Sequence, residues 1–201
     1  MDRDVWNRRY ETSELVWTAE PNQFLVAETA GLVPGRALDL GAGEGRNAVW
    51  LAEHGWTVTA VDFSDVGLAK ARELASSRGV SIDTVCEDAT RFHATSAFDL
   101  VVVLYLQLPA DLRRAAYTGA AAALAPGGTL LVVGHDSTNL TEGYGGPQDE
   151  AVLFSPDDVV ADLAGSGLVI ERAERVARSI STADGERRAI DALVRARRPA
   201  E

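Results

Sequence analysis

Short apolar runs alternate along the chain with longer segments in which apolar residues recur every three or four positions. The short runs are typical of strands, and the periodic segments are typical of helices that bury one face. Strands are predicted over residues 37–40, 58–61, 82–85, 98–104 and 129–133, and helices over 21–30, 46–54, 65–78, 111–124 and from 156 onward. This alternation predicts an α/β domain with a parallel sheet.

Residues at the ends of these segments support the boundaries. Pro21 is expected in the first turn of the first helix, and Ser64 as the N-cap of the third. Ser155-Pro156-Asp157-Asp158 combines a cap, an N1 proline and an acidic first turn. Two last apolar segments, at 168–177 and 188–196, surround the turn signal Asp184-Gly185 and predict an antiparallel hairpin.

Composition narrows the class of protein. The 201 residues carry no linker or repeat, so we expect a single domain over residues 1–201. Cys86 is the only cysteine, so an internal disulfide is excluded and the fold does not depend on an oxidising compartment. No stretch is apolar enough to span a membrane. We therefore expect a cytoplasmic protein with no membrane partner. The formal net charge of −11 argues against a nucleic-acid partner, because a polyanion favours basic patches.

The most informative motif is Asp39-Leu40-Gly41-Ala42-Gly43-Glu44-Gly45, which lies between a predicted strand and a predicted helix. Glycines there let the backbone turn sharply and approach a ligand. A dinucleotide motif needs a third glycine at position 46, which is Arg46, and the carboxylates of Asp39 and Glu44 would repel a pyrophosphate. S-adenosylmethionine carries a sulfonium and an ammonium group and no phosphate, so it suits this loop better.

Further acids follow the next two strands. Asp62 ends the second strand, where its carboxylate can accept hydrogen bonds from ribose hydroxyls, and Phe63 beside it can pack on adenine. Asp88 follows the third strand, within reach of the adenine amino group. A lone aspartate after a strand is usually a turn former, but three such acids after three strands favour a nucleoside site.

With these residues the chain resembles the class I S-adenosylmethionine-dependent methyltransferases. The loop at 39–45, the strand at 98–102 and the Leu124-Ala125-Pro126-Gly127-Gly128 turn match the motifs of that family. Trp6-Asn7-Arg8-Arg9-Tyr10 and Gly45-Arg46-Asn47 resemble its small TehB-like branch, which includes tellurite-resistance and thiol methyltransferases.

The resemblance implies a Rossmann-like, doubly wound sheet of seven strands in the order 3-2-1-4-5-7-6, with strand 7 antiparallel. It also implies S-adenosylmethionine as cofactor and S-adenosylhomocysteine as product. The implied cofactor residues are Asp39, Gly41, Ala42, Gly43, Glu44, Arg46, Asn47, Asp62, Phe63, Ser64, Asp88, Ala89 and Leu104. Arg46 is the candidate for the methionine carboxylate.

Acceptor contacts are expected at the ends of strands four and five. Tyr105 follows strand four, and His135 follows strand five, where it is a candidate general base or a merely structural residue. Residues 136–152 form a long glycine-rich loop, which we expect to be a flap, and residues 1–30 an N-terminal helical segment that is either a lid or ordinary packing. The three histidines and Cys86 are too scattered for a zinc cluster, so no metal is expected.

The function predicted is methyl transfer to a small-molecule acceptor by SN2 displacement. A non-catalytic S-adenosylmethionine-binding sensor or subunit is the alternative, and an NAD-linked oxidoreductase is disfavoured by Asp39 and Arg46. The acceptor atom and the oligomeric state do not follow from the sequence.

Overall fold

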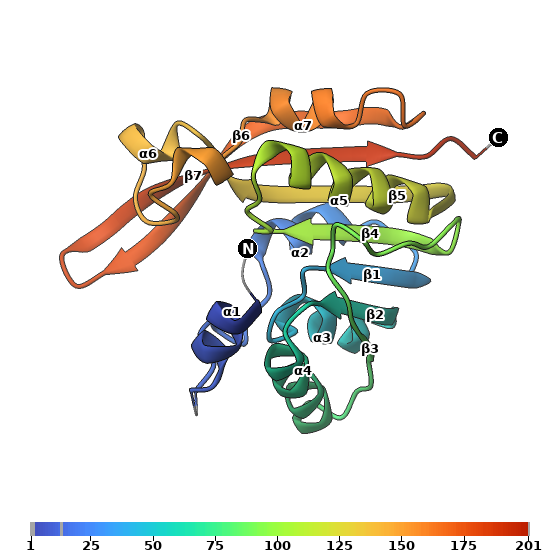
Figure 1. Cartoon of the computed structure of the whole chain (residues 1–201), viewed down its shortest axis with the longest axis horizontal. Coiled ribbons are helices and arrows are strands. Elements are labelled where there is room, and N and C mark those ends of the chain that lie inside the picture. The colour runs from blue at the N-terminus through green and yellow to red at the C-terminus, as the bar shows by residue number, and fades with distance from the viewer. Residues whose placement is uncertain (1–2, 13, 201) are drawn as a thin grey trace.

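The computed structural model describes residues 3–12 and 14–200, and it is built on one seven-stranded sheet. The strand order is β3-β2-β1-β4-β5-β7-β6, and β7 is antiparallel to its neighbours while the other pairings are parallel (Figure 1). The predicted fold and strand order are therefore confirmed. The strands are β1 (Arg36–Leu40), β2 (Thr57–Asp62), β3 (Asp83–Cys86), β4 (Phe98–Leu104), β5 (Leu124–His135), β6 (Val169–Thr182) and β7 (Gly185–Arg197).

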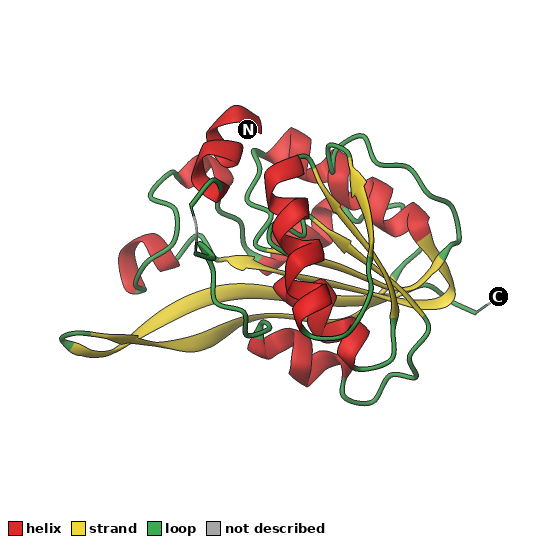
Figure 2. Ribbon diagram, turned by 90° about the horizontal axis from the view of Figure 1, so that it is seen from below, coloured by secondary structure: helices red, strands yellow, loops and turns green. Residues whose placement is uncertain are grey.

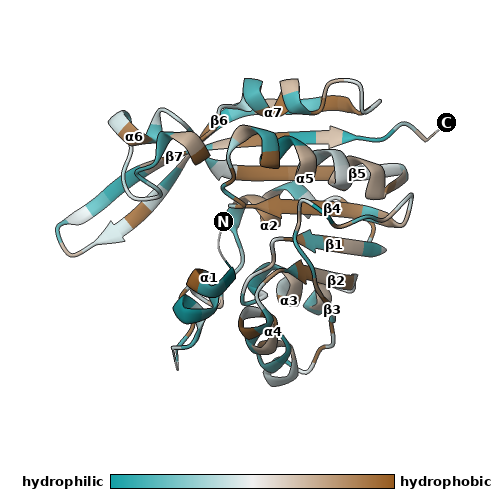
Figure 3. Ribbon diagram, viewed as in Figure 1, coloured by the Kyte–Doolittle hydropathy of each residue, from teal (hydrophilic) through white to brown (hydrophobic). Residues whose placement is uncertain are grey.

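Helices cover both faces of the sheet. They are α1 (Arg3–Tyr10), α2 (Gln23–Thr29), α3 (Arg46–Glu53), α4 (Asp65–Ser77), α5 (Ala110–Ala123), α6 (Asn139–Glu142) and α7 (Pro156–Asp162), with a 3₁₀ turn η1 at Glu150–Val152. Alternate residues of β4 point into two separate cores, Val101 toward Tyr117 of α5 and Leu100 toward Leu51 of α3. The central strands are correspondingly apolar in Figure 3. Among the described residues, no helix is long and apolar enough to cross a membrane.

The predicted starts of α2 and β5 are wrong. The second helix begins at Gln23, because the Asn22 side chain caps it by accepting hydrogen bonds from two backbone N–H groups, and Pro21 lies before the cap. The fifth strand begins at Leu124, which pairs with Phe98, although the regular ladder resumes only at Thr129. The Pro126-Gly127-Gly128 segment forms the irregularity between them.

The terminal hairpin is longer than its apolar pattern predicted. Its two-residue loop is Ala183-Asp184, and Gly185 opens β7 with a φ of +111°. β5 ends at His135, which pairs with Asp191. The rest of the hairpin therefore has no residue of β5 beside it to pair with. This part, residues 176–190, is called the arm here, and Figure 2 shows it projecting from the sheet.

The carboxyl ends of β1, β2, β4 and β5 meet at one edge of the molecule. Figure 1 shows α1, α6 and the arm gathered at this same edge. Ligands of open α/β sheets bind at such an edge. The flap and the N-terminal segment therefore lie where the sequence predicted the functional site.

Candidate cofactor and acceptor site

A cavity of about 740 Å³ opens at this edge, within the usual size range of small-molecule sites. Its walls come from the loops after β1, β2, β4 and β5, from the N-terminal segment, from the flap and from the arm. Most of the sequence-predicted site residues line it. Those that do are Gly41, Ala42, Gly43, Glu44, Arg46, Asn47, Asp62, Phe63, Leu104, Tyr105 and His135.

The glycine loop at residues 41–45 needs its glycines for conformation and for space. Gly41, Gly43 and Gly45 have φ values of +84°, +56° and +82°, which L side chains rarely adopt. A Cβ on Gly45 would also lie 2.5 Å from the Cβ of Ala71. The loop thus packs directly on α4 and leaves its outer surface to the cavity.

Asp62 holds this loop in place. One carboxylate oxygen accepts a hydrogen bond of 2.8 Å from the Gly43 N–H, and the other accepts one of 2.8 Å from the Ser64 N–H. Burial raises the pKa of the carboxyl, and these backbone donors oppose that rise. Each oxygen keeps a second lone pair, so Asp62 can bind a ligand while it fixes the loop.

Asp39 lies behind the loop and does not line the cavity. Its side chain is 1% exposed, and burial together with the nearby charge of Asp62 raises its pKa to about 7. Arg46 and a hydrogen bond from the Ala48 backbone N–H oppose the rise. Asp39 is one of the two acids that were expected to repel a pyrophosphate. In the structure it is a buried group whose pKa lies near neutral pH, so both of its protonation states are accessible.

Glu44, the other carboxylate, is occupied by the N-terminal segment. It accepts hydrogen bonds of 3.1 Å from the backbone N–H groups of Val16 and Trp17. Lys70 of α4 lies 3.0 Å from it and also donates to the Glu14 carbonyl. Although Glu44 lines the cavity, its charge is compensated by Lys70.

Asn47 and Ser64 make a second set of contacts with the N-terminal segment. Asn47 accepts a hydrogen bond of 2.9 Å from the Asn22 N–H, and the Ser64 hydroxyl donates one of 2.6 Å to Asn7. Ser64 is buried and also caps α4, as predicted. These two residues thus tie the N-terminal segment to the glycine loop and α4.

Asp88 and Ala89 lie outside the residues that line the cavity. The Asp88 carboxylate accepts hydrogen bonds from the backbone N–H and the hydroxyl of Thr90, so it caps the turn after β3. The expected contact of Asp88 with adenine stays a prediction.

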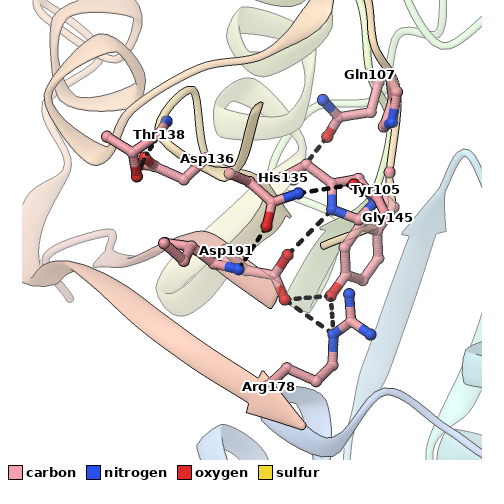
Figure 4. Close-up of polar contacts among 12 residues, drawn as sticks. Tyr105, Gln107, His135, Asp136, Thr138, Gly145, Arg178 and Asp191 are labelled. Atoms are coloured by element: carbon pink, nitrogen blue, oxygen red, sulfur yellow. Dashed lines mark hydrogen bonds and ion pairs between the residues drawn. The ribbon is translucent and has the colours of Figure 1, made fainter. Parts of the chain in front are cut away.

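On the acceptor side, His135 faces Asp191 (Figure 4). The two residues are register partners on β5 and β7, and Nδ1 of His135 lies 3.3 Å from Oδ1 of Asp191. That distance suits an ion pair once the imidazole is protonated, and neither atom has a hydrogen-bond partner among the described residues. With Nδ1 turned toward Asp191, Nε2 is the ring nitrogen that Asp191 does not engage.

Tyr105 is held in a strained conformation beside this pair. Its φ is +57°, which is uncommon for a residue other than glycine and often marks a functional site. Its hydroxyl donates a hydrogen bond of 2.7 Å to Asp191, and burial raises its pKa. Because the phenolic proton is committed to Asp191, Tyr105 is placed to orient its neighbours rather than to remove a proton.

Arg178 of the arm and Gln107 complete the surroundings of His135. Arg178 donates from Nε to Asp191 at 3.0 Å. Gln107 accepts from the His135 N–H at 2.9 Å and donates to the Val152 carbonyl of the flap at 2.7 Å. Gly146 of the flap lies so close over the imidazole that a Cβ there would come within 2.9 Å of it.

Sequence reasoning missed Asp191, Arg178 and Gln107. A signal existed for Asp191, because it is the only charged residue between Ala189 and Val194. A charge inside an apolar strand indicates a buried partner. Arg178 gave no such signal, since its position depends on the length of the arm.

The sheet order, the glycine loop and the acid at the end of β2 define a Rossmann-like enzyme of the methyltransferase class. Residues 37–128, somewhat less than half of the chain, match the methyltransferase domain family, and this match together with the fold supports an S-adenosylmethionine-dependent methyltransferase. S-adenosylmethionine is accordingly its cofactor.

Among curated proteins, the chain is 26% identical over 173 residues to thiocyanate methyltransferase 1 of Arabidopsis thaliana, covering 83% of this chain and 75% of that protein. A shorter stretch of 47 residues is 40% identical to ribosomal RNA small subunit methyltransferase C of Alcanivorax borkumensis, covering 23% of this chain and 14% of that protein.

Two solved structures resemble the whole fold. One, from work on the conversion of a disulfide bond into a thioacetal group during echinomycin biosynthesis, has a TM-score of 0.79 and 26% identity over 99% of this chain and 93% of its own. TehB of Haemophilus influenzae has a TM-score of 0.73 and 19% identity over 98% of this chain and 66% of its own, a likeness of fold.

Proposed function

We propose that the chain methylates a small-molecule acceptor and that His135, oriented by Asp191, takes the acceptor's proton. The observation that carries this proposal is the position of the His135–Asp191 pair. It faces the same cavity as the glycine loop and Asp62, so a proton acceptor and a cofactor site share one enclosed space.

The cofactor is proposed to lie on the glycine loop. S-adenosylmethionine supplies a methyl group already activated by its sulfonium. The loop residues and Asp62 fit its adenosine, because the glycine backbone is open to the cavity and Asp62 retains acceptor capacity. Gly45 gives α3 no side-chain cap, so that helix end, together with Arg46, suits the methionine carboxylate.

His135 acts on an acceptor that arrives protonated. His135 lines the cavity, and its Nε2, the ring nitrogen that Asp191 does not engage, is proposed to accept the proton of a thiol, hydroxyl or amine as the new bond to carbon forms. The carboxylate of Asp191 lies against Nδ1 and stabilises the imidazolium that results. Tyr105 and Arg178 hold that carboxylate in position.

The N-terminal segment and the flap are proposed to exclude water from this space, within a single domain over residues 1–201. Trp17 and Leu15 line the cavity from the first, and Gly146 and Pro147 line it from the second. A small acceptor is consistent with the enclosure and with the thiocyanate methyltransferase relative. Placement in the TehB-like branch rests on the motifs at 6–10 and 45–47 and on the similar fold of TehB. The absence of a metal and of a nucleic-acid partner stay predictions.

The test is release of S-adenosylhomocysteine with a panel of thiols, phenols and amines. Wild-type protein should turn over at least one of them, and His135→Ala should lose about 10²–10⁴-fold in kcat while its cofactor affinity stays nearly unchanged. His54→Ala, at the exposed end of α3, is the matched control and should behave as wild type. Wild-type rates for every accepted substrate in the His135→Ala variant would overturn the role of His135.

A further inference from the structure

Arg178 is anchored through only one side of its guanidinium group. Its Nε donates hydrogen bonds to Asp191 at 3.0 Å and to the Tyr105 hydroxyl at 3.2 Å. In the described part of the chain, its two terminal nitrogens have no hydrogen-bond partner, and Figure 4 shows them turned away from Asp191. Because Arg178 lines the cavity, it presents there a rigid pair of parallel donors.

The charges that face the cavity are unusual for this chain. Three arginines, Arg9, Arg46 and Arg178, line it against two acids, Asp62 and Glu44. Glu44 is already paired with Lys70 and Arg178 with Asp191, which leaves Arg9 and Arg46 against Asp62. The cavity is therefore cationic in a protein whose formal net charge is −11. A cationic cavity that also takes a sulfonium needs an anionic second ligand.

Arg46 and Arg178 are separate candidates for separate anions. Arg46 lies at the start of α3 beside the glycine loop, where the proposed cofactor would place its one carboxylate. Arg178 contacts the Tyr105 hydroxyl and Asp191, next to the pair that is proposed to take the acceptor's proton. Burial lowers the pKa of Arg46 and the positive charge of Arg178 adds to this, so an anion near either group relieves their repulsion.

The wall around Arg178 is apolar. Ile180 lies two residues further along β6, on the same face of the arm, and lines the cavity with Leu106 and Pro147. Asp191 and Asp62 nearby disfavour a doubly charged group. The ligand that fits is one carboxylate on an apolar body, since a guanidinium binds a carboxylate through two parallel hydrogen bonds.

We infer that Arg178 binds a carboxylate of the methyl acceptor, so that the substrate is an apolar monocarboxylic acid bearing the nucleophile. This inference rests on the proposed function and names the substrate class of the same site. The arm thereby supplies acceptor recognition, while the sheet supplies the cofactor site and the base.

The experiment measures binding to protein saturated with S-adenosylhomocysteine, so it does not require turnover. Phenylacetate, 3-phenylpropionate and 4-phenylbutyrate are compared with their primary amides by titration calorimetry. At least one acid should bind about 10-fold or more tightly than its amide, the effect of hydrogen bonds to a charged group. If no acid binds more tightly than its amide, the inference is overturned.

Arg178→Gln should remove this preference, whereas Arg187→Gln should keep it. Arg187 is the matched control, because it pairs with Ile180 on the same arm, is exposed and does not line the cavity. Arg178→Lys retains the charge next to Asp191 and serves if the glutamine variant does not fold. The lysine variant should bind the acids at least about threefold more weakly than wild type, because an ammonium lacks the planar fork.

Two outcomes separate this inference from the proposed function. If S-adenosylhomocysteine itself does not bind the wild-type protein, the proposed function fails. If S-adenosylhomocysteine binds the wild-type protein but Arg178→Gln leaves the acid preference intact, only the inference fails. The inference also fails if Arg178→Gln lowers the affinity for S-adenosylhomocysteine tenfold, because that loss would assign Arg178 to the cofactor.

Discussion

His135 and Asp191 stand opposite each other across the antiparallel pair of β5 and β7, with Nδ1 and Oδ1 3.3 Å apart. The pairing register fixes this relationship, because directly opposed residues project from the same face of a sheet. Burial would raise the pKa of Asp191, but its contacts with His135, Arg178 and Tyr105 lower it instead. A carboxylate that stays ionised beside an imidazole is suited to orient it.

Asp191→Asn should lower kcat by about 10²- to 10⁴-fold, comparable to the loss of the base, because the amide can favour the wrong tautomer of the ring and cannot stabilise its charge. Tyr105→Phe is the control, since it removes one hydrogen bond to Asp191 and leaves the His135–Asp191 pair in place. Steady-state kinetics with an acceptor from the panel measures both. Equal kcat losses in the two variants would contradict a particular role for the pair.

Asp62→Ala should weaken S-adenosylmethionine binding by about 1.5–3 kcal/mol, the range for hydrogen bonds to a charged group. The loop will also lose the acceptor of the Gly43 N–H, so thermal unfolding must be followed in parallel. Asp99→Ala is the matched control, because Asp99 also accepts a hydrogen bond from a backbone N–H, that of Arg36, and does not line the cavity. Calorimetry that finds Asp62→Ala as tight as the parent would disprove the ribose placement.

Lys70→Met should destabilise the protein by about 1–3 kcal/mol, because the buried Glu44 carboxylate loses its ion-pair partner. Adding Glu44→Gln should recover part of that loss, since the uncompensated charge is then removed. Urea unfolding of the parent, both single variants and the double variant gives the coupling free energy. Strict additivity would show that the two side chains do not interact.

Stability should fall as pH rises from about 4 toward 7, by up to about 1.4 kcal/mol per pH unit from Asp39 alone. The sign follows because the pKa of Asp39 is raised to about 7 in the folded protein, which then holds a proton that the unfolded chain has released. Asp39→Asn should flatten this slope and be more stable than the parent at pH 8. Asp62, whose pKa is also raised, adds a slope of the same sign. Urea unfolding at pH 5 and pH 8 checks the difference, and parallel slopes for parent and variant would contradict it.

The fold could be predicted because its signals are local. The glycine loop, the cap at Ser64 and the apolar run from Phe98 to Leu104 each specify their own element and thereby the edge where a ligand binds. The positions of Asp62 and His135 at that edge follow from the strand ends.

The partners of those residues could not be predicted in the same way. Glu44 was expected to face the cofactor, and its contacts with Val16, Trp17 and Lys70 depend on how the N-terminal segment crosses the loop. Asp191 meets His135 only because of the β5–β7 register, which no short-range pattern determines.

The far end of the arm is separate from the elements that carry the glycine loop and the base. Its far strands, from Ser179 to Arg188, pair only with each other. Substitutions there lie outside the two main cores, so a lineage can exchange Ile180 and acquire a different acceptor while the cofactor site stays unchanged. In evolutionary terms, the hairpin is where substrate choice can diverge fastest between descendants of one ancestral enzyme.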